Sequence, residues 1–302
     1  RSRQFVQKSV QVLHLELEGR GAREIQHVLD QGGDFLLVAP EHLPPLERTL
    51  HVAALQTGFQ KVLPAAHALE QVLDVVGDFR KRKTDRGDYT VEALYFHSRP
   101  NWPVSAALYL PKQFEGPLPA IMVVHGHAFT QKAAPVYQKV AVHYVKNGYA
   151  VLAVDFVGGG DRLAQKHESR YFFTADMTVQ ALMVWDNMRA VDYLMTRPEI
   201  DPKRIGITGS SGGGNQTAYT TLFDERIAAS APVNAVTMFD EHMAVGCDYY
   251  CPCEVIPGMW RIAEYSDLIA TVAPRPLLLV SAMKDRLFPI KGVREVYYRA
   301  RE

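Results

Sequence analysis

One short stretch of the sequence combines residue types and spacing that suit nucleophilic catalysis. Residues 204–217 read Arg-Ile-Gly-Ile-Thr-Gly-Ser-Ser-Gly-Gly-Gly-Asn-Gln-Thr, and Gly209, Ser211 and Gly213 within them fit the pattern G-x-S-x-G. A serine at the tip of a tight strand-to-helix turn brings the residues two places before and after it close together, so only small side chains fit there. Ser210 would have a threonine two places before it. We therefore predict Ser211 as the nucleophile of an acyl transfer.

Other uses of a glycine-rich turn fit the sequence less well. A phosphate-binding loop needs Lys-Ser or Lys-Thr after its last glycine, but Asn215 and Gln216 follow Gly214. The glycines at 158–160 do not form a dinucleotide-binding loop, because Leu163 stands where the third glycine is needed. These mismatches leave the nucleophile interpretation as our prediction for the turn.

The loop after residues 120–124 is predicted to stabilise the charge that such a reaction develops. These apolar residues predict a buried strand, and His125-Gly-His127 follows it. In a site of this geometry, one oxyanion donor is the amide after the nucleophile and the second comes from this loop. We predict the amides of Gly212 and His127 as the two donors. The side chains of His125 and His127 either face the pocket or are ordinary turn histidines.

A third segment supplies a carboxylate. Asp285 follows the apolar run at 276–281, and Pro289 after it is consistent with a fixed turn. A carboxylate in such a loop can orient a histidine and stabilise its charged form. We predict Asp285 as the acid of a catalytic triad, with Asp240 and Glu241 as reserve candidates.

The elements around these residues alternate between strand and helix patterns. Strands alternating with helices imply right-handed crossovers and a mostly parallel central sheet with helices on both faces. We divide the chain into an N-terminal helical extension, residues 1–85, and an α/β domain, residues 86–302, with a cap-like insertion at about 234–267. The predicted strands lie at 34–38, 90–97, 104–110, 120–124, 149–154, 205–208, 227–233 and 276–281, and the main helices at 137–147, 174–196 and 291–301. Residues 80–83 are predicted as a solvated loop.

The residues described so far resemble the α/β-hydrolase superfamily of serine esterases over roughly residues 86–302. Further motifs are similar to acetylxylan-esterase-like and dienelactone-hydrolase-like esterases: His125-Gly-His127, Asp155 with residues 158–162, Ile205 to Gly214, Cys251-Pro-Cys253 with Pro257-Gly258, and Ala273-Pro-Arg-Pro-Leu277. The resemblance implies an α/β-hydrolase fold, triad residues in the order Ser, Asp, His, and a small-molecule or carbohydrate ester as substrate, with no cofactor.

The resemblance also implies a catalytic histidine beyond Asp285, after one more helix and strand. No histidine follows Asp285 in the sequence. We therefore expect the final strand and the histidine to lie beyond Glu302, and the strand at 276–281 to have an open edge in this chain. The alternatives are a base recruited from His127 or His242, and a relative that has lost its catalytic activity.

The insertion at 234–267 is too long for a tight connection between two strands and is predicted to cap the pocket. Its aromatic side chains either line a sugar or aryl pocket or pack within the cap; these are Tyr249, Tyr250 and Trp260. Its cysteines do not fit the common C-x2-C spacing of zinc sites, so we predict no metal site and expect a disulfide or buried free thiols; these are Cys247, Cys251 and Cys253.

Composition limits the partners of the protein. The 302 residues carry 33 basic and 33 acidic side chains, and this balance argues against a general attraction to nucleic acid or anionic membranes. No apolar run approaches the ~18 residues of a membrane span. The first residues lack the apolar core of a signal peptide, so the compartment stays open, including a secreted or periplasmic origin if the N-terminus was trimmed. Oligomeric state is undetermined.

We predict a serine carboxylesterase or hydrolase that acts through an acyl-enzyme on Ser211. The resemblance alone implies that its substrate is an acetylated carbohydrate ester. An acyl-peptidase of the same fold is the nearest alternative among enzymes. A binding protein on a non-catalytic hydrolase fold is the alternative from a different class. A histidine in the expected position would favour an enzyme over the binding protein.

Overall fold

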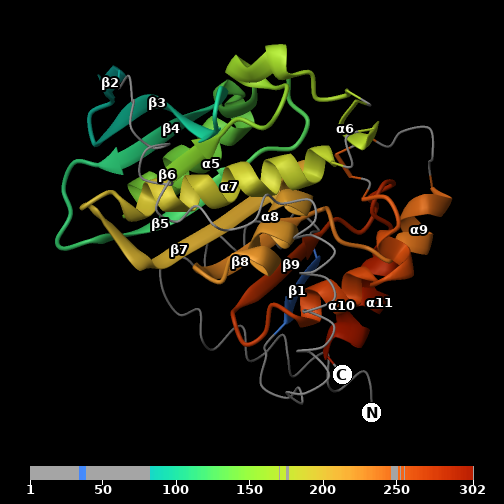
Figure 1. The fold of residues 1–302 in the computed structure, drawn as a ribbon. Coiled ribbons are helices and arrows are strands. Elements are labelled where there is room, and N and C mark those ends of the chain that lie inside the picture. Colours follow the sequence, from blue (N-terminus) through green and yellow to red (C-terminus); the bar gives the residue numbers. More distant parts are fainter. Residues whose placement is uncertain are drawn as a thin grey trace, which may run out of the picture.

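The fold is known from a computed structural model, which describes residues 34–38, 82–169, 171–174, 177–245, 251, 253–254 and 256–301. The described strands form one nine-stranded sheet in the order β1-β9-β8-β7-β5-β6-β4-β3-β2 (Figure 1). The strands are β1 (Asp34–Val38), β2 (Arg82–Asp85), β3 (Tyr89–Arg99), β4 (Trp102–Pro111), β5 (Leu118–Val124), β6 (Ala150–Val154), β7 (Ile200–Ser210), β8 (Ile227–Val233) and β9 (Leu277–Ser281).

The centre of the sheet is parallel. β6, β5, β7, β8 and β9 pair in parallel along the sheet, whereas β2, β3 and β4 form an antiparallel meander that joins β6. Parallel strands need a crossover connection between them, and helices supply it here. Every residue of β6 is buried, as expected for a central strand covered on both faces.

Helices cover both faces of the sheet (Figure 1). Side chains alternate along β5: Val123 packs with α5, whereas Met122 and Val124 belong to the core that includes α7. The helices are α5 (Pro135–Lys146), α6 (Tyr171–Thr174), α7 (Val179–Met195), α8 (Gly212–Phe223), α9 (Phe239–Ala244), α10 (Tyr265–Ala270) and α11 (Ile290–Arg301), with the 3-10 turns η1 (Gln131–Ala133), η2 (Gly160–Gln165) and η4 (Met259–Arg261). The predicted α/β architecture is confirmed.

The N-terminal part of the chain contributes to the sheet. The strand predicted at 34–38 is confirmed as β1, which pairs antiparallel with β9 from Asp34 opposite Ser281 to Val38 opposite Leu277 (Figure 1). The expectation of an open edge on this strand was therefore wrong, because β1 takes up the backbone groups along it. The rest of the predicted helical extension up to residue 81 lies outside the described residues.

Two boundaries differ from the predictions. Residues 82–85 form β2 rather than the end of a solvated loop, because they pair with β3. The long helix predicted from residue 174 begins as α7 at Val179, because the side-chain oxygen of Thr178 accepts the amide hydrogen of Ala181 at 3.0 Å and caps the helix. None of the described helices is both long enough and apolar enough to cross a bilayer.

Candidate active site

Ser211 occupies a strained turn between β7 and α8. Its backbone has φ 58° and ψ −125°, a conformation that residues with a Cβ atom rarely adopt. Its amide donates to the carbonyl oxygen of Val233 at 2.9 Å, which ties the turn to the end of β8. Ser210, in contrast, is the last residue of β7 and has no such positive φ. The strain falls on the serine that the glycine spacing selects.

The two flanking glycines leave no room for a side chain. A Cβ atom on Gly209 would lie 2.3 Å from the carbonyl oxygen of Val124 and 2.7 Å from that of Gly213. A Cβ atom on Gly213 would lie 2.4 Å from the same Val124 oxygen. The close approach predicted for these two positions is therefore confirmed, and it is the backbone of β5 that sets the limit.

The start of α8 gives the turn a positive electrostatic end. Gly212 is the first residue of α8, and the first amides of a helix have no acceptor within the helix. The helix dipole adds partial positive charge at the same point. The ring of His127 lies against this residue, since a Cβ atom on Gly212 would be 3.4 Å from its Cε1 atom. The structure thus brings Ser211, Gly212 and His127 together.

Tyr137 accepts a hydrogen bond from one amide of the loop after β5. The amide of Gly126 donates to the hydroxyl oxygen of Tyr137, which comes from α5, at 2.7 Å. This hydrogen bond commits the Gly126 amide to the protein itself. The amide of His127 therefore stays our predicted second oxyanion donor.

His125 has a structural place at the end of β5. It is fully buried, and its ring centroid lies 4.2 Å from that of Tyr137. Burial lowers the pKa of His125 to about 3, so the ring is neutral near pH 7. Its carbonyl oxygen accepts from the side-chain amide of Gln216 at 2.9 Å. Its side chain therefore does not reach an open pocket.

Asp285 lies in the loop after β9, as predicted, and its surroundings are now visible. Its Oδ1 atom accepts from the amides of Leu287 at 2.9 Å and Phe288 at 3.0 Å, which shapes the loop. His242 of α9 packs beside it, with its Nδ1 atom 2.9 Å from the Leu287 carbonyl oxygen and its ring stacked on Phe288. Burial lowers the pKa of His242, and the charge of Asp285 opposes this shift. Asp285 and His242 thus contact the same short segment, Leu287 and Phe288.

The reserve acids and the cap aromatics have other surroundings. Asp240 accepts the amide of Glu241 at 2.8 Å, and Glu241 forms an ion pair with Lys291 of α11. Trp260 is 69 % exposed on η4, with the guanidinium of Arg261 5.3 Å from its ring centroid. The remaining predicted cap residues, Tyr249, Tyr250 and Cys247, lie outside the described residues.

Asp155, the residue after β6, anchors the loop that follows β5. The Asp155 carboxylate is fully buried and forms an ion pair with Lys132, whose amide also donates to it at 3.0 Å. The hydroxyl of Ser105 donates to its second oxygen at 2.7 Å. These contacts fix the backbone of the residues that follow His127.

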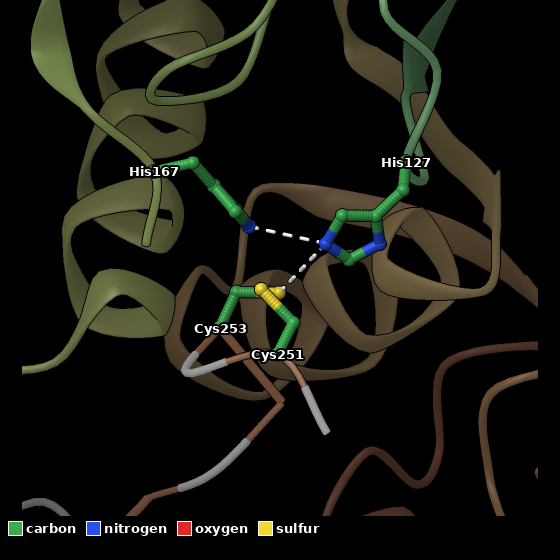
Figure 2. Close-up of side chains that lie close together, drawn as sticks. All are labelled: His127, His167, Cys251 and Cys253. Atoms are coloured by element: carbon green, nitrogen blue, oxygen red, sulfur yellow. Dashed lines mark hydrogen bonds between the residues drawn. The ribbon is translucent and has the colours of Figure 1, made fainter. Parts of the chain in front are cut away.

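A cluster that the sequence did not predict lies beside this loop (Figure 2). His127, His167, Cys251 and Cys253 point their nitrogen and sulfur atoms toward one another, all within 4.8 Å. Cys251 and Cys253 are free thiols, so of the alternatives predicted for the cap these two follow the free-thiol one. Hydrogen bonding to Cys253, and then to the two histidines, holds the pKa of Cys251 well below its ordinary range, whereas burial raises the pKa of Cys253. Only the C-x-C pair was visible in the sequence.

A buried ion pair holds the segment that leads to His167. The guanidinium of Arg162 in η2 contacts the carboxylate of Asp186 in α7 at 2.6 Å, with both side chains only 2 % exposed. The same guanidinium donates to the carbonyl oxygen of Asp155 at 2.8 Å. Arg162 thus joins η2, α7 and the end of β6.

Arg162→Met is expected to lower the free energy of unfolding by about 3–5 kcal/mol, because it leaves the Asp186 carboxylate buried without its partner. The double variant Arg162→Met/Asp186→Asn is expected to recover part of that loss, since the uncompensated charge is gone. Urea unfolding of the three proteins measures both effects. Arg204→Met is the matched control, because its ion pair with Asp201 at 2.7 Å has side chains 53 % and 28 % exposed to solvent, and its loss is expected to matter much less. Equal losses for Arg162→Met and Arg204→Met would contradict the prediction.

The fold and the turn together define the class of the protein. A parallel sheet covered by helices on both faces, with a serine at positive φ between a strand and the N-terminus of a helix, is the arrangement of the α/β-hydrolases. A sequence model of the acetyl xylan esterase (AXE1) family matches residues 66–239, and the chain belongs to this family. It is a hydrolase that acts on carboxylic esters.

Individual relatives agree with this assignment. The YtaP protein of Bacillus subtilis (strain 168) is 28 % identical over 261 residues, which cover 76 % of this chain and 85 % of YtaP. The solved structure of BF1801 from Bacteroides fragilis has a TM-score of 0.66 at 18 % identity and covers 94 % of this chain and 80 % of its own. An acetyl xylan esterase from Paenibacillus sp. R4 has a TM-score of 0.58 at 16 % identity, covering 86 % and 87 %. At these identities the two structures support the fold.

Proposed function

We propose that the protein is a serine carboxylesterase that removes acetyl groups from a carbohydrate ester through an acyl-enzyme on Ser211. The observation that carries this proposal is the backbone of Ser211, held at φ 58° at the N-terminus of α8. Strain of this kind persists only where the surrounding structure imposes it, and it is concentrated at functional sites. Here the backbone of β5 and the two glycines impose it.

In the proposed reaction, the Ser211 hydroxyl oxygen attacks the ester carbonyl carbon and the carbonyl oxygen becomes negatively charged. The amides of Gly212 and His127 donate hydrogen bonds to that oxygen. A histidine oriented by Asp285 takes the serine proton and passes it to the leaving alcohol as the ester bond breaks. Water then hydrolyses the acyl-enzyme by the same sequence of proton transfers, releasing acetate and free Ser211.

The substrate class is proposed from the family. The chain belongs to the acetyl xylan esterase family, and one of its structural neighbours is an acetyl xylan esterase. An acetyl group is too small to distinguish one ester from another, so such an esterase recognises the alcohol part of its substrate. We propose that the segment between β8 and β9 makes these contacts. No observation favours the peptidase alternative.

A fluorophosphonate probe tests the proposal directly. Incubation of the purified protein with the probe, followed by peptide mapping in a mass spectrometer, is expected to show one label, on Ser211. Prior incubation with acetylated xylo-oligosaccharide should slow the labelling, whereas a peptide amide should not. Ser210→Ala serves as the matched control and should label normally. A label on Ser210, or hydrolysis of the ester by protein that never labels, would rule out the assignment.

A further inference from the structure

We propose that His127, His167, Cys251 and Cys253 bind one structural zinc ion, which fixes the cap segment against the loop beside Ser211. The four side chains converge on a common centre (Figure 2). This proposal stands independently of the proposed esterase reaction, because it rests on the arrangement of the four side chains alone.

The distances within the cluster fit a tetrahedral zinc site. Zinc binds histidine nitrogen at about 2.0–2.1 Å and cysteine sulfur at about 2.3 Å, so neighbouring ligand atoms of a tetrahedron lie about 3.3 Å apart for two nitrogens and about 3.5 Å apart for nitrogen and sulfur. The Nε2 atoms of His127 and His167 are 3.1 Å apart, and the Cys253 sulfur is 3.4 Å from the His127 Nε2 atom. These two distances are within a few tenths of an ångström of the ideal values, and the other pairs of ligand atoms lie within 4.8 Å of one another.

The surroundings of His167 prepare it as a ligand. Its Nδ1 atom lies 2.7 Å from the carbonyl oxygen of Val157. Because a carbonyl oxygen only accepts, Nδ1 must carry a proton, and the Nε2 atom of the neutral ring then directs its lone pair into the cluster. A backbone carbonyl that fixes the tautomer of a histidine in this way is a common support for metal-bound histidines. His167 is buried, so the ring is held in this orientation.

The donor set selects the metal. Two thiolates and two imidazoles suit zinc, whereas calcium and magnesium require oxygen ligands. The two negative charges of the thiolates balance the charge of Zn²⁺, so the ion can lie next to the buried Cys253 without an uncompensated charge. Four protein ligands leave no open position for water or substrate, which is the arrangement of a structural rather than a catalytic zinc.

The position of the cluster explains what the ion would do. His127 follows β5, His167 follows η2, and the two cysteines belong to the segment between β8 and β9. A single ion would therefore connect three parts of the chain that are far apart in sequence. His127 also lies against Gly212, so the ion would hold the cap segment beside the nucleophile turn.

Metal analysis of the purified protein is the first test. Protein prepared without chelators and under reducing conditions is expected to contain about one zinc ion per chain. Cys253→Ser and His167→Gln should each lose most of it, because both variants remove a ligand. Cys247→Ser is the matched control, since it removes a third cysteine of the same segment that is outside the four, and it should keep the ion. Equal zinc loss in Cys247→Ser would overturn the assigned ligand set.

Cobalt replacement keeps the test valid if the ligand variants fail to fold. The wild-type protein, with zinc exchanged for Co²⁺, is expected to show the intense visible bands of tetrahedral cobalt and the near-ultraviolet bands of sulfur-to-cobalt charge transfer. A strong chelator should also lower the Tm of the wild-type protein. A disulfide between Cys251 and Cys253 in metal-free protein that is as stable as the wild type, or an octahedral cobalt spectrum, would overturn the proposal. Labelling of Ser211 is read out separately, so a negative result in one test leaves the other intact.

Discussion

Replacing Ser211 with alanine is expected to lower kcat for an acetyl ester by about six orders of magnitude, the scale seen when the nucleophile of such a site is removed. The reason is that Ser211 is the proposed nucleophile, and alanine removes the hydroxyl that would form the acyl-enzyme. The amides of Gly212 and His127 would remain, and oxyanion stabilisation with substrate binding alone leaves a residual rate of about 10³–10⁴ over water. Steady-state kinetics with p-nitrophenyl acetate and with acetylated xylo-oligosaccharide measure the loss.

The effect of Ser211→Ala should lie in kcat rather than in stability. Alanine removes only the hydroxyl oxygen, and no described side-chain hydrogen bond caps α8 through Ser211. The Tm of the variant should therefore equal or exceed that of the wild type, because alanine keeps the Cβ atom and its fit at the turn. Ser210→Ala is the matched control and should retain wild-type kcat. A kcat loss that is equal for both serines would show that the turn has only a structural role.

Gly213→Val is expected to abolish both activity and soluble expression, with a loss of stability on the order of 3 kcal/mol or more. The Cβ atom would lie 2.4 Å from the Val124 carbonyl oxygen, 2.8 Å from the His125 carbonyl carbon and 2.9 Å from the Gly126 amide nitrogen. All three atoms belong to the backbone of the β5 strand end and the loop after it. They cannot rotate away as a side chain could, so α8 and β5 would have to separate.

A matched pair of smaller substitutions isolates this effect. Gly213→Ala adds the same clashing Cβ atom. Gly206→Ala on β7, in contrast, meets the movable end of the Ile121 side chain at 3.1 Å and no backbone atom closer than 3.4 Å. Gly213→Ala should therefore lose much more stability than Gly206→Ala in urea unfolding. A soluble, active Gly213→Val protein would show that the backbone at the turn is not as close as described.

Local rules explain why much of this protein was readable from its sequence. The strands at the centre of the sheet are short apolar runs between helix patterns, and such alternation has few solutions other than a covered parallel sheet. The serine turn was readable because its limit is steric and local: Gly209 and Gly213 had to be glycine for the backbone to close on itself. The strand at 34–38 was predicted from another local feature, a short apolar run of strand length.

The partners of these elements were not readable in the same way. Nothing in residues 34–38 indicates that they pair with β9. The spacing of Arg162 and Asp186 also does not predict a buried ion pair. Likewise, only the position of α5 shows that Tyr137 takes the amide of Gly126. Each of these contacts joins residues that are far apart in sequence, and pairing across such separations depends on the packed arrangement of the whole sheet.

The same distinction, between what neighbouring residues specify and what the packed fold specifies, applies to the chemistry of the molecule. The sequence by itself determined the class of reaction, because a nucleophile turn is specified by neighbouring residues whose backbone must close tightly. Only the tertiary structure decided that His127 and His167 meet Cys251 and Cys253. The C-x-C pair matches no common zinc spacing, and the two histidines beside it come from the loops after β5 and η2. A site assembled from three loops has no local signature, because the fold, and not the spacing along the chain, sets the distances between its atoms.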